Sequence, residues 1–212
     1  MNEIIIPNWP IPQKRYEILA LQELLKNEKL TKIVEIGTWM GGTALLWAIM
    51  VSKNNGRLFC CDLSFYYGSF YSQLTGKHYN QLTYKEPEYT EFAKHITELE
   101  GNSHDPAYIA KVFEAVSPGT VDFMFIDGDH TYEGVKADFY NFLPLMKPGG
   151  YVAFHDILKT ADHISLGCRV EEFWSEIKDK FEYWEFVDNN EYLCYGGPCP
   201  SKSMGIGVIK TK

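Results

Sequence analysis

Short apolar segments that alternate with segments of helical period are the feature that most constrains the fold of this sequence. The alternation predicts an open α/β sheet that is covered by helices on both faces. Right-handed crossovers between the strands place their carboxyl ends along one edge of the sheet, and ligands bind at that edge. The strands are expected at residues 32–36, 57–61, 95–99, 121–126, 151–154, 181–187 and 204–209, and the helices at 12–27, 43–51, 106–116, 135–146 and 170–177.

The alternation stops once, at residues 64–94, where nine aromatic side chains follow no clean period. Two interpretations stay open for this segment: a surface insertion that packs its own aromatic residues, or a lid over the ligand-binding edge. A chain of 212 residues has the length of one domain. Residues 1–212 are therefore expected to form a single domain that carries this insertion.

The charge balance argues against nucleic-acid and membrane partners. With 20 basic and 28 acidic residues the net charge is −8, and an acidic surface repels phosphate backbones and anionic lipids. No apolar run reaches the roughly 18 residues that a bilayer-spanning helix needs, and the first residues do not resemble a signal peptide. The five cysteines suggest no disulfide framework, although Cys194 and Cys199 could meet. We therefore expect a cytoplasmic protein, and its exposed aromatic residues are compatible with a homodimer.

A glycine-bearing turn follows the first expected strand, and it excludes two common phosphate-binding loops. A dinucleotide fingerprint needs a glycine two positions after Gly37, where Trp39 stands. A Walker A loop needs a lysine between Gly42 and the hydroxyl residue, but Thr43 follows Gly42 directly. The turn still opens a helix, whose free N–H groups can receive a smaller ligand.

The pattern Glu-x-Gly-x-x-x-Gly at residues 35–41 resembles motif I of class I S-adenosylmethionine-dependent methyltransferases. The resemblance implies a Rossmann-like domain in which this turn holds the amino-acid part of S-adenosyl-L-methionine. It also implies that Asp62, at the end of the second strand, binds the ribose hydroxyls, because two carboxylate oxygens suit a vicinal diol. The loop after the third strand then lies beside the adenine. The expected cofactor-binding residues are Glu35, Gly37, Thr38, Gly41, Thr43, Asp62, Asn102, Ser103 and Asp127.

A second motif, FIDGDHTYEGVKADF, begins at Phe125, and the segment LPLMKPGGYVAFHD follows it up to Asp156. Together they resemble the small-molecule O-methyltransferase branch that includes sugar and macrolide methyltransferases and the cephalosporin hydroxylase-like proteins. The resemblance covers most of residues 12–212 and excludes 64–94. It implies a doubly wound, mostly parallel sheet of seven strands with an antiparallel C-terminal strand.

Asp127 and Asp156 end two strands that should be neighbours, so their carboxylates are expected in one cleft. Two like charges there are unfavourable unless they share a proton or a cation, and oxygen ligands favour Mg²⁺ while allowing Mn²⁺ or Ca²⁺. In the metal-dependent relatives that the sequence resembles, the residues matching Asp127, His155 and Asp156 hold the ion. Here His155 replaces a carboxylate, and three outcomes stay open: the ion is lost, is bound more weakly, or is a transition metal.

His130, three residues after Asp127, is the expected catalytic base. The resemblance to macrolide methyltransferases implies this role, and an ordinary imidazole pKa of about 6.5 allows it to take a hydroxyl proton. The alternative is a histidine at a helix start that hydrogen-bonds to the backbone. The remaining histidines are interpreted as structural or exposed; they are His78, His95, His104 and His163.

The predicted reaction moves a methyl group from S-adenosyl-L-methionine to a hydroxyl of a small molecule, and a divalent cation would assist if the site holds one. Two alternatives stay open. The first is a hydroxylase or oxidoreductase on the same fold, in which His130, His155 and Asp156 hold iron. The second is a cofactor-binding interaction module without catalysis, whose interface is the aromatic insertion.

Overall fold

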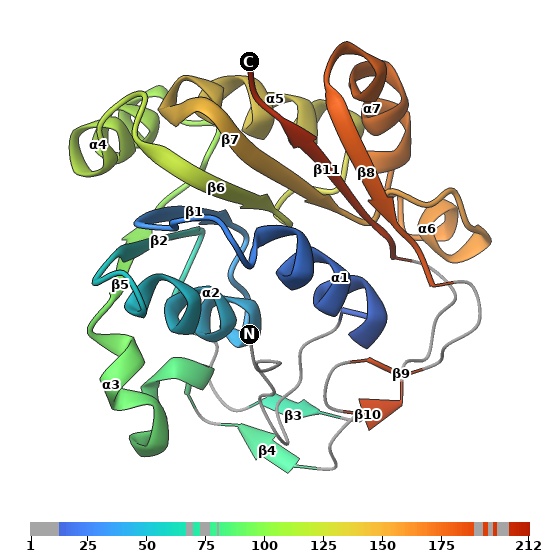
Figure 1. The fold of residues 1–212 in the computed structure, drawn as a ribbon. Coiled ribbons are helices and arrows are strands. Elements are labelled where there is room, and N and C mark those ends of the chain that lie inside the picture. The colour runs from blue at the N-terminus through green and yellow to red at the C-terminus, as the bar shows by residue number, and fades with distance from the viewer. Residues whose placement is uncertain are drawn as a thin grey trace.

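The computed structural model describes residues 13–66, 81–188 and 204–212 in full (Figure 1). Between these ranges it describes only the backbone of four short strands, which are β3 (Phe70–Ser72), β4 (Lys77–Tyr79), β9 (Leu193–Cys194) and β10 (Gly197–Pro198). The expected proximity of Cys194 and Cys199 therefore lies outside the described side chains, as does the aromatic stretch 67–80.

Seven of the described strands form one sheet. They are β1 (Lys32–Ile36), β2 (Arg57–Asp62), β5 (Ile96–Glu100), β6 (Val121–Ile126), β7 (Met146–His155), β8 (Glu182–Phe186) and β11 (Ile206–Lys210). Their order across the sheet is β5-β2-β1-β6-β7-β11-β8. Among them β11 alone is reversed, because it pairs antiparallel with both β7 and β8. The predicted seven-stranded, mostly parallel sheet with an antiparallel C-terminal strand is confirmed.

Helices cover both faces of this sheet (Figure 1). They are α1 (Arg15–Leu25), α2 (Gly42–Ser52), α3 (Thr90–Ala93), α4 (Pro106–Val116), α5 (Tyr132–Phe142), α6 (Ala161–Ser165) and α7 (Val170–Ile177), with 3₁₀ turns η1 (Thr83–Lys85), η2 (Pro87–Tyr89), η3 (Leu143–Leu145) and η4 (Lys178–Lys180). α1 and α2 pack on one face, around the fully buried Trp47. α4, α5 and α7 pack on the other, where Phe139, Phe154 and Phe173 contact one another.

Among the described residues, no helix combines the length and the apolarity that crossing a lipid bilayer requires.

The largest difference from the expected boundaries lies between α5, which ends at Phe142, and β7, which already begins at Met146. The Lys-Pro-Gly-Gly stretch at 147–150, expected to stop a helix, therefore belongs to the strand. The pairing of β6 with β7 is irregular between Val121 and Phe123. A proline is tolerated in a strand beside such an irregularity, because no regular ladder hydrogen bond is lost.

Residues 81–94 are the part of the expected insertion whose side chains the structure describes most fully, and they pack against the glycine turn. The Thr83 hydroxyl donates to the Met40 carbonyl at 2.7 Å. The buried Tyr84 ring fills the space beside Gly41, where a Cβ would lie 2.6 Å from the ring. The Tyr84 hydroxyl donates to Glu98 at 2.9 Å. This part of the segment therefore supports the turn that opens α2.

Candidate active site

A pocket of about 990 Å³ opens at the carboxyl edge of the sheet, beside the ends of β1, β2, β5, β6 and β7. It lies where an α/β sheet of this topology binds ligands. The predicted site residues that line it are Gly37, Thr38, Thr43, Asp62, Asn102, Ser103, Asp127, His130, His155 and Asp156. Glu35 and Gly41 are the two predicted residues outside its lining. The roles assigned to all of them from the sequence stay predictions.

Gly37 allows the ends of β1 and β6 to meet. Its φ of +84° lies in the left-handed region, and a Cβ here would lie 2.1 Å from the Asp127 carbonyl oxygen. The backbone N–H of Gly37 donates to the Cys61 carbonyl at 2.9 Å, and that of Asp127 donates to the Ile36 carbonyl at 2.8 Å. Glycine is required at this position because any side chain would push the two strand ends apart.

The start of α2 faces the pocket. Gly41, with φ of +77°, is the N-cap residue and makes no side-chain cap hydrogen bond. Gly42 and Thr43, the first two residues of the helix, line the pocket. The N–H groups and the dipole of a helix start favour an anionic group such as a carboxylate.

Asp62 binds the glycine turn and also lines the pocket. Its Oδ2 accepts hydrogen bonds from the backbone N–H groups of Thr38 at 2.7 Å and Trp39 at 2.9 Å. Its Oδ1 accepts a longer one from the Ser64 N–H at 3.3 Å. The turn therefore fixes the position of the carboxylate that the sequence assigns to a ribose diol.

Glu35 lies inside the protein behind the turn, fully buried. Burial raises the pKa of its carboxyl to about 8, although the hydroxyls of Thr43 and Thr38 oppose the rise. The Cys60 thiol donates to its Oε2 at 3.7 Å, and its Oε1 has no hydrogen-bond partner among the described residues. Glu35 therefore supports the turn from within, and its direct contact with a cofactor stays a prediction.

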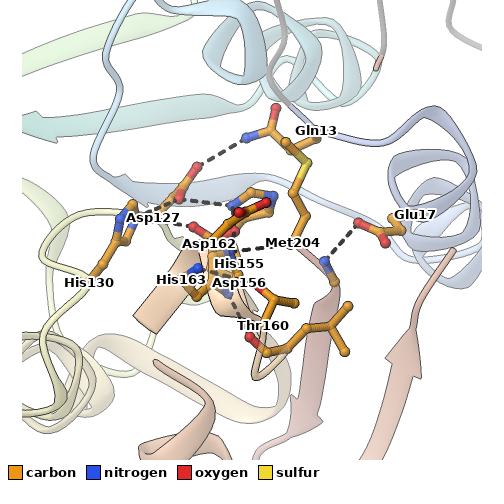
Figure 2. A network of polar contacts seen from close by, with 12 residues as sticks. Gln13, Glu17, Asp127, His130, His155, Asp156, Thr160, Asp162, His163 and Met204 are labelled. Carbon is orange, nitrogen blue, oxygen red and sulfur yellow. Dashed lines mark hydrogen bonds and ion pairs between the residues drawn. The ribbon is translucent and has the colours of Figure 1, made fainter. Parts of the chain in front are cut away.

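His130 and Asp127 form a hydrogen-bonded pair in the pocket wall (Figure 2). Nε2 of His130 lies 3.1 Å from Oδ1 of Asp127 and 3.7 Å from Oδ2 of Asp156. The hydrogen bond to Asp127 raises the pKa of His130 against the opposing effect of burial. The imidazole is 43% exposed, so a molecule in the pocket can reach it. Gln13, at the start of the described chain, donates to Oδ2 of Asp127 at 3.0 Å.

His155 lies between the two carboxylates that the sequence predicted to share a cation. Its Nδ1 is 3.2 Å from Oδ1 of Asp127 and 3.3 Å from Oδ1 of Asp156. The φ of Asp156, +63°, turns the chain at the end of β7 so that these adjacent residues face the same cluster. Adjacent residues inside a strand point to opposite faces, so these two side chains can face one cluster only because the strand ends here.

The charges of this cluster stabilise one another. Burial acts to lower the pKa of His155, but the two carboxylates hold it well above its ordinary value. Burial acts to raise the pKa values of Asp127 and Asp156, but the neighbouring imidazoles hold both below the ordinary value. An imidazolium therefore balances the acidic pair.

His163 and Cys168 belong to the same pocket, a placement that the sequence did not indicate. We interpreted His163 as structural or exposed, yet α6 brings its Nε2 to 3.2 Å from Oδ1 of Asp156. Cys168 is buried beside them. No motif spacing marks these residues or Gln13, because the irregular segment 157–168 and the start of α1 reach the site only through the tertiary fold.

The kinds of donor atom in the pocket determine which metal ion it could bind. Among the residues that the structure describes, two groups have ligand atoms that lie within 4.8 Å of one another: Asp127 with His130 and Asp156, and Asp156 with His163 and Cys168. Mg²⁺ prefers an octahedral shell of oxygen ligands, whereas imidazole and thiolate suit Zn²⁺ and similar ions. Each group contains a nitrogen, and one contains sulfur. The donor chemistry therefore fits a transition ion better than Mg²⁺.

Sequence comparisons connect the chain to one family. The family model described as a methyltransferase domain matches residues 34–157, more than half of the chain. The uncharacterized protein y4gI of Sinorhizobium fredii (strain NBRC 101917 / NGR234) is 24% identical over 147 residues, 69% of this chain and 15% of that protein. The uncharacterized protein R132 of Acanthamoeba polyphaga mimivirus is 29% identical over 123 residues, 58% of this chain and 50% of that protein. The matched region thus spans half or less of these curated relatives.

Solved structures of methyltransferases share the fold. An O-methyltransferase from Bacillus cereus, in complex with SAH, has a TM-score of 0.60 and 18% identity, over 91% of this chain and 79% of that chain. The MycE methyltransferase of the mycinamycin biosynthetic pathway, in complex with Mg, SAH and mycinamycin VI, has a TM-score of 0.53 and 15% identity, over 91% of this chain and 48% of that chain. At these identities the likeness concerns the fold alone. With the family model matching more than half of its length, the chain belongs to the methyltransferase-domain family.

Proposed function

We propose that this protein is an S-adenosyl-L-methionine-dependent O-methyltransferase that acts on a hydroxyl of a small molecule. One observation carries the proposal: a single pocket contains both the glycine turn with Asp62 and the hydrogen-bonded pair of His130 and Asp127. The turn has the features of a cofactor site, and the pair has those of a general base.

The cofactor side of the pocket is formed by the glycine turn, Asp62 and the loop after β5. The helix start at Gly42 and Thr43 suits the carboxylate of the cofactor, and Asp62 suits its ribose diol. Asn102 and Ser103 line the part of the pocket that is left for the adenine. When bound, S-adenosyl-L-methionine supplies an electrophilic methyl group on a sulfonium.

The acceptor side is formed by His130 and its partner. With Nε2–H donated to Asp127, Nδ1 carries the lone pair that takes the hydroxyl proton. Asp127 then stabilises the imidazolium that results. The oxygen that loses its proton to Nδ1 would then accept the methyl group that a bound cofactor supplies, with S-adenosylhomocysteine as the leaving group. General-base catalysis of this kind contributes about 10²–10⁴-fold, and the positioning of the two reactants supplies much of the rest.

An acceptor with an apolar part suits the mouth of the pocket. Trp39, Leu63 and Leu166 line the pocket and keep 38%, 72% and 81% of their surface exposed. We also propose the cytoplasm as the site of action. The described free cysteines Cys60, Cys61 and Cys168 are buried thiols, which a reducing compartment preserves.

Isothermal titration calorimetry with S-adenosylhomocysteine tests the proposal. We expect micromolar binding, and weaker binding by Asp62→Ala because this variant loses the diol partner and loosens the turn. Asp179→Ala, an exposed carboxylate on η4 outside the pocket lining, should bind as the wild type does. Absence of binding to the folded wild-type protein would exclude the proposed function for every acceptor.

A further inference from the structure

We propose that Asp156, His163 and Cys168 bind one transition-metal ion, with Zn²⁺ as the best fit, and that this ion fastens residues 157–168 to the end of β7. The three ligands come from the end of β7, from α6 and from the turn before α7. The site shares only Asp156 with the set that the sequence predicted. Ion binding here needs neither cofactor nor turnover, so the inference stands apart from the proposed function.

The distances between the three ligand atoms are close to those found around a bound zinc ion. A carboxylate oxygen, an imidazole nitrogen and a thiol sulfur all lie within 4.8 Å of one another. The ligands of a tetrahedral zinc ion lie roughly 3.3–3.8 Å apart, given bonds of about 2.0–2.3 Å. Nε2 of His163 and Oδ1 of Asp156 are already 3.2 Å apart. Small changes in side-chain conformation are therefore enough for the three ligand atoms to coordinate one ion.

The hydrogen bonding of His163 favours a positive charge at this place. Its Nδ1 lies 2.6 Å from the Leu158 carbonyl oxygen, so Nδ1 carries a proton and donates it. In a neutral ring, Nε2 then presents a lone pair to the Asp156 carboxylate at 3.2 Å. Two acceptors at this distance repel each other. Either a second proton or a metal ion at Nε2 removes the repulsion.

The surroundings of His163 favour the metal ion over the proton. A second proton on His163 would give a hydrogen bond to Asp156 and no contact with Cys168. A metal ion would bind Asp156 and would also take the buried thiol of Cys168 as a ligand. The backbone N–H of Met204 approaches Nε2 at 3.4 Å, which is too long to compete with a metal–nitrogen bond. Oxygen, nitrogen and sulfur donors together select zinc-like ions and disfavour Mg²⁺.

The backbone already holds the ligands in place. The bond from Nδ1 of His163 to Leu158 is the support that metal-binding histidines usually have, since the second ring nitrogen donates to a carbonyl or carboxylate. The Cys168 N–H donates to the His163 carbonyl at 2.9 Å, which closes a turn that brings the two side chains together. His163 and Cys168 are 5% and 7% exposed, so water competes weakly with the ion.

The consequence concerns the wall of the pocket. Residues 157–168 contribute Asp162, Ser165 and Leu166 to its lining, and a metal ion would tie this segment to the sheet. Binding requires the Cys168 thiol to lose its proton, so each ion releases a proton. Loss of the ion should loosen the segment and lower the thermal stability of the protein.

Metal analysis of the full chain tests the proposal directly. Protein purified without chelator from zinc-supplemented medium should carry one zinc ion per chain by mass spectrometry. After chelation, Zn²⁺ should restore the original melting temperature, and Mg²⁺ at the same concentration should not. Loading with Co²⁺ should produce a thiolate-to-cobalt charge-transfer absorption, which oxygen and nitrogen ligands alone do not give.

Variants identify the ligands. Cys168→Ser should abolish the charge-transfer absorption, and His163→Gln should abolish stoichiometric binding. Cys61→Ser is the matched control and should keep the absorption. Its thiol is also free, buried and in the lining of the same pocket, but it lies outside the ligand group.

Two results would overturn the proposal. If the folded wild-type protein binds neither Zn²⁺ nor Co²⁺, a proton supplies the charge at His163. If Co²⁺ binds without the charge-transfer absorption, the ion is held by Asp127, His130 and Asp156 instead. Both measurements are made on the wild-type protein, so they do not depend on whether a variant folds. Neither changes the calorimetric test of the cofactor site.

Discussion

Nε2 of His130 lies 3.1 Å from Oδ1 of Asp127, across the short turn that joins β6 to α5. The contact orients the imidazole and raises its pKa. A base must be neutral to accept a proton, so activity should appear as the pH rises through this raised pKa. The pair thus determines which ring nitrogen is basic and at which pH the site works.

We predict that His130→Gln lowers kcat by about 10²–10⁴-fold and leaves the affinity for S-adenosylhomocysteine within about twofold. Glutamine keeps a polar group of similar size but cannot take the proton. Turnover measured with an acceptor found by screening, together with calorimetry, checks both parts. Full activity in this variant would remove the assignment of the base.

We predict that Asp127→Asn moves the lower inflection of the pH–rate profile to lower pH. The charged hydrogen bond that His130 donates to Asp127 raises the pKa of His130, so its loss lets the imidazole become neutral at lower pH. The profile of kcat against pH, compared with that of the wild type, measures the shift. An unchanged inflection would show that another group titrates.

We predict that His155→Gln alters the pH dependence of stability. The measurement is made in the presence of a chelator. In the folded protein the pKa of His155 is raised above its ordinary value of 6.5. The stabilisation that the charged imidazole provides is therefore complete below pH 6.5 and is lost as the pH rises through the raised pKa. The free energy of unfolding of the wild type should therefore decrease as the pH rises through this pKa. The variant should not show this decrease with pH. Breaking a buried charge cluster also costs about 3–5 kcal/mol near neutral pH.

Urea unfolding at several pH values measures this slope. His95→Gln is the control, because His95 is also buried but its Nδ1 contacts the Gly56 carbonyl and, among the described residues, no carboxylate. It should keep the wild-type slope. The same slope in His155→Gln would contradict the prediction.

We predict that Gly37→Ala costs about 1–3 kcal/mol more than Gly119→Ala. Both glycines have positive φ, so both variants suffer the backbone strain of roughly 1–2 kcal/mol. A Cβ at Gly119 meets nothing within 4 Å, whereas one at Gly37 meets the Asp127 carbonyl at 2.1 Å. Denaturant unfolding of the two variants isolates the cost of the clash. Gly37→Ala should also lose binding of S-adenosylhomocysteine.

We predict that Glu35→Gln stabilises the protein above pH 4.5. The folded pKa of about 8 exceeds the ordinary 4.5, so between these values the folded protein retains a proton that the unfolded chain releases. This costs about 1.4 kcal/mol of unfolding free energy per pH unit, and glutamine avoids the cost. Unfolding at pH 5 and pH 8 measures the difference. Because Glu35 lies outside the pocket lining, binding of S-adenosylhomocysteine by the same variant tests its predicted contact with the cofactor: unchanged affinity would contradict that contact.

The sequence was sufficient to predict the sheet, and ten of the twelve residues that it assigned to the site line the pocket. Strand-end residues such as Asp62 and Asp127 must lie at one edge once the topology is known, because parallel strands share that edge. Periodicity could not place the start of β7, since Pro148 is admitted only by an irregularity in the partner pairing. It could not place His163 either, because no repeat links α6 to the end of β7.

The reversed strand β11 has a consequence for how the protein forms during synthesis. Among the described strands, β8 is hydrogen-bonded to β11 alone, yet β8 leaves the ribosome first. β8 therefore has no strand to pair with until β11 is synthesised and inserts between β8 and β7. Strand pairing over such a separation in the sequence is slow. Met204 and Gly205, just before β11, reach His163 and Glu17 only then. In the nascent chain, the side of the pocket formed by His163 and Met204 is therefore completed last, after the strand ends that carry Gly37 and Asp62 are in place.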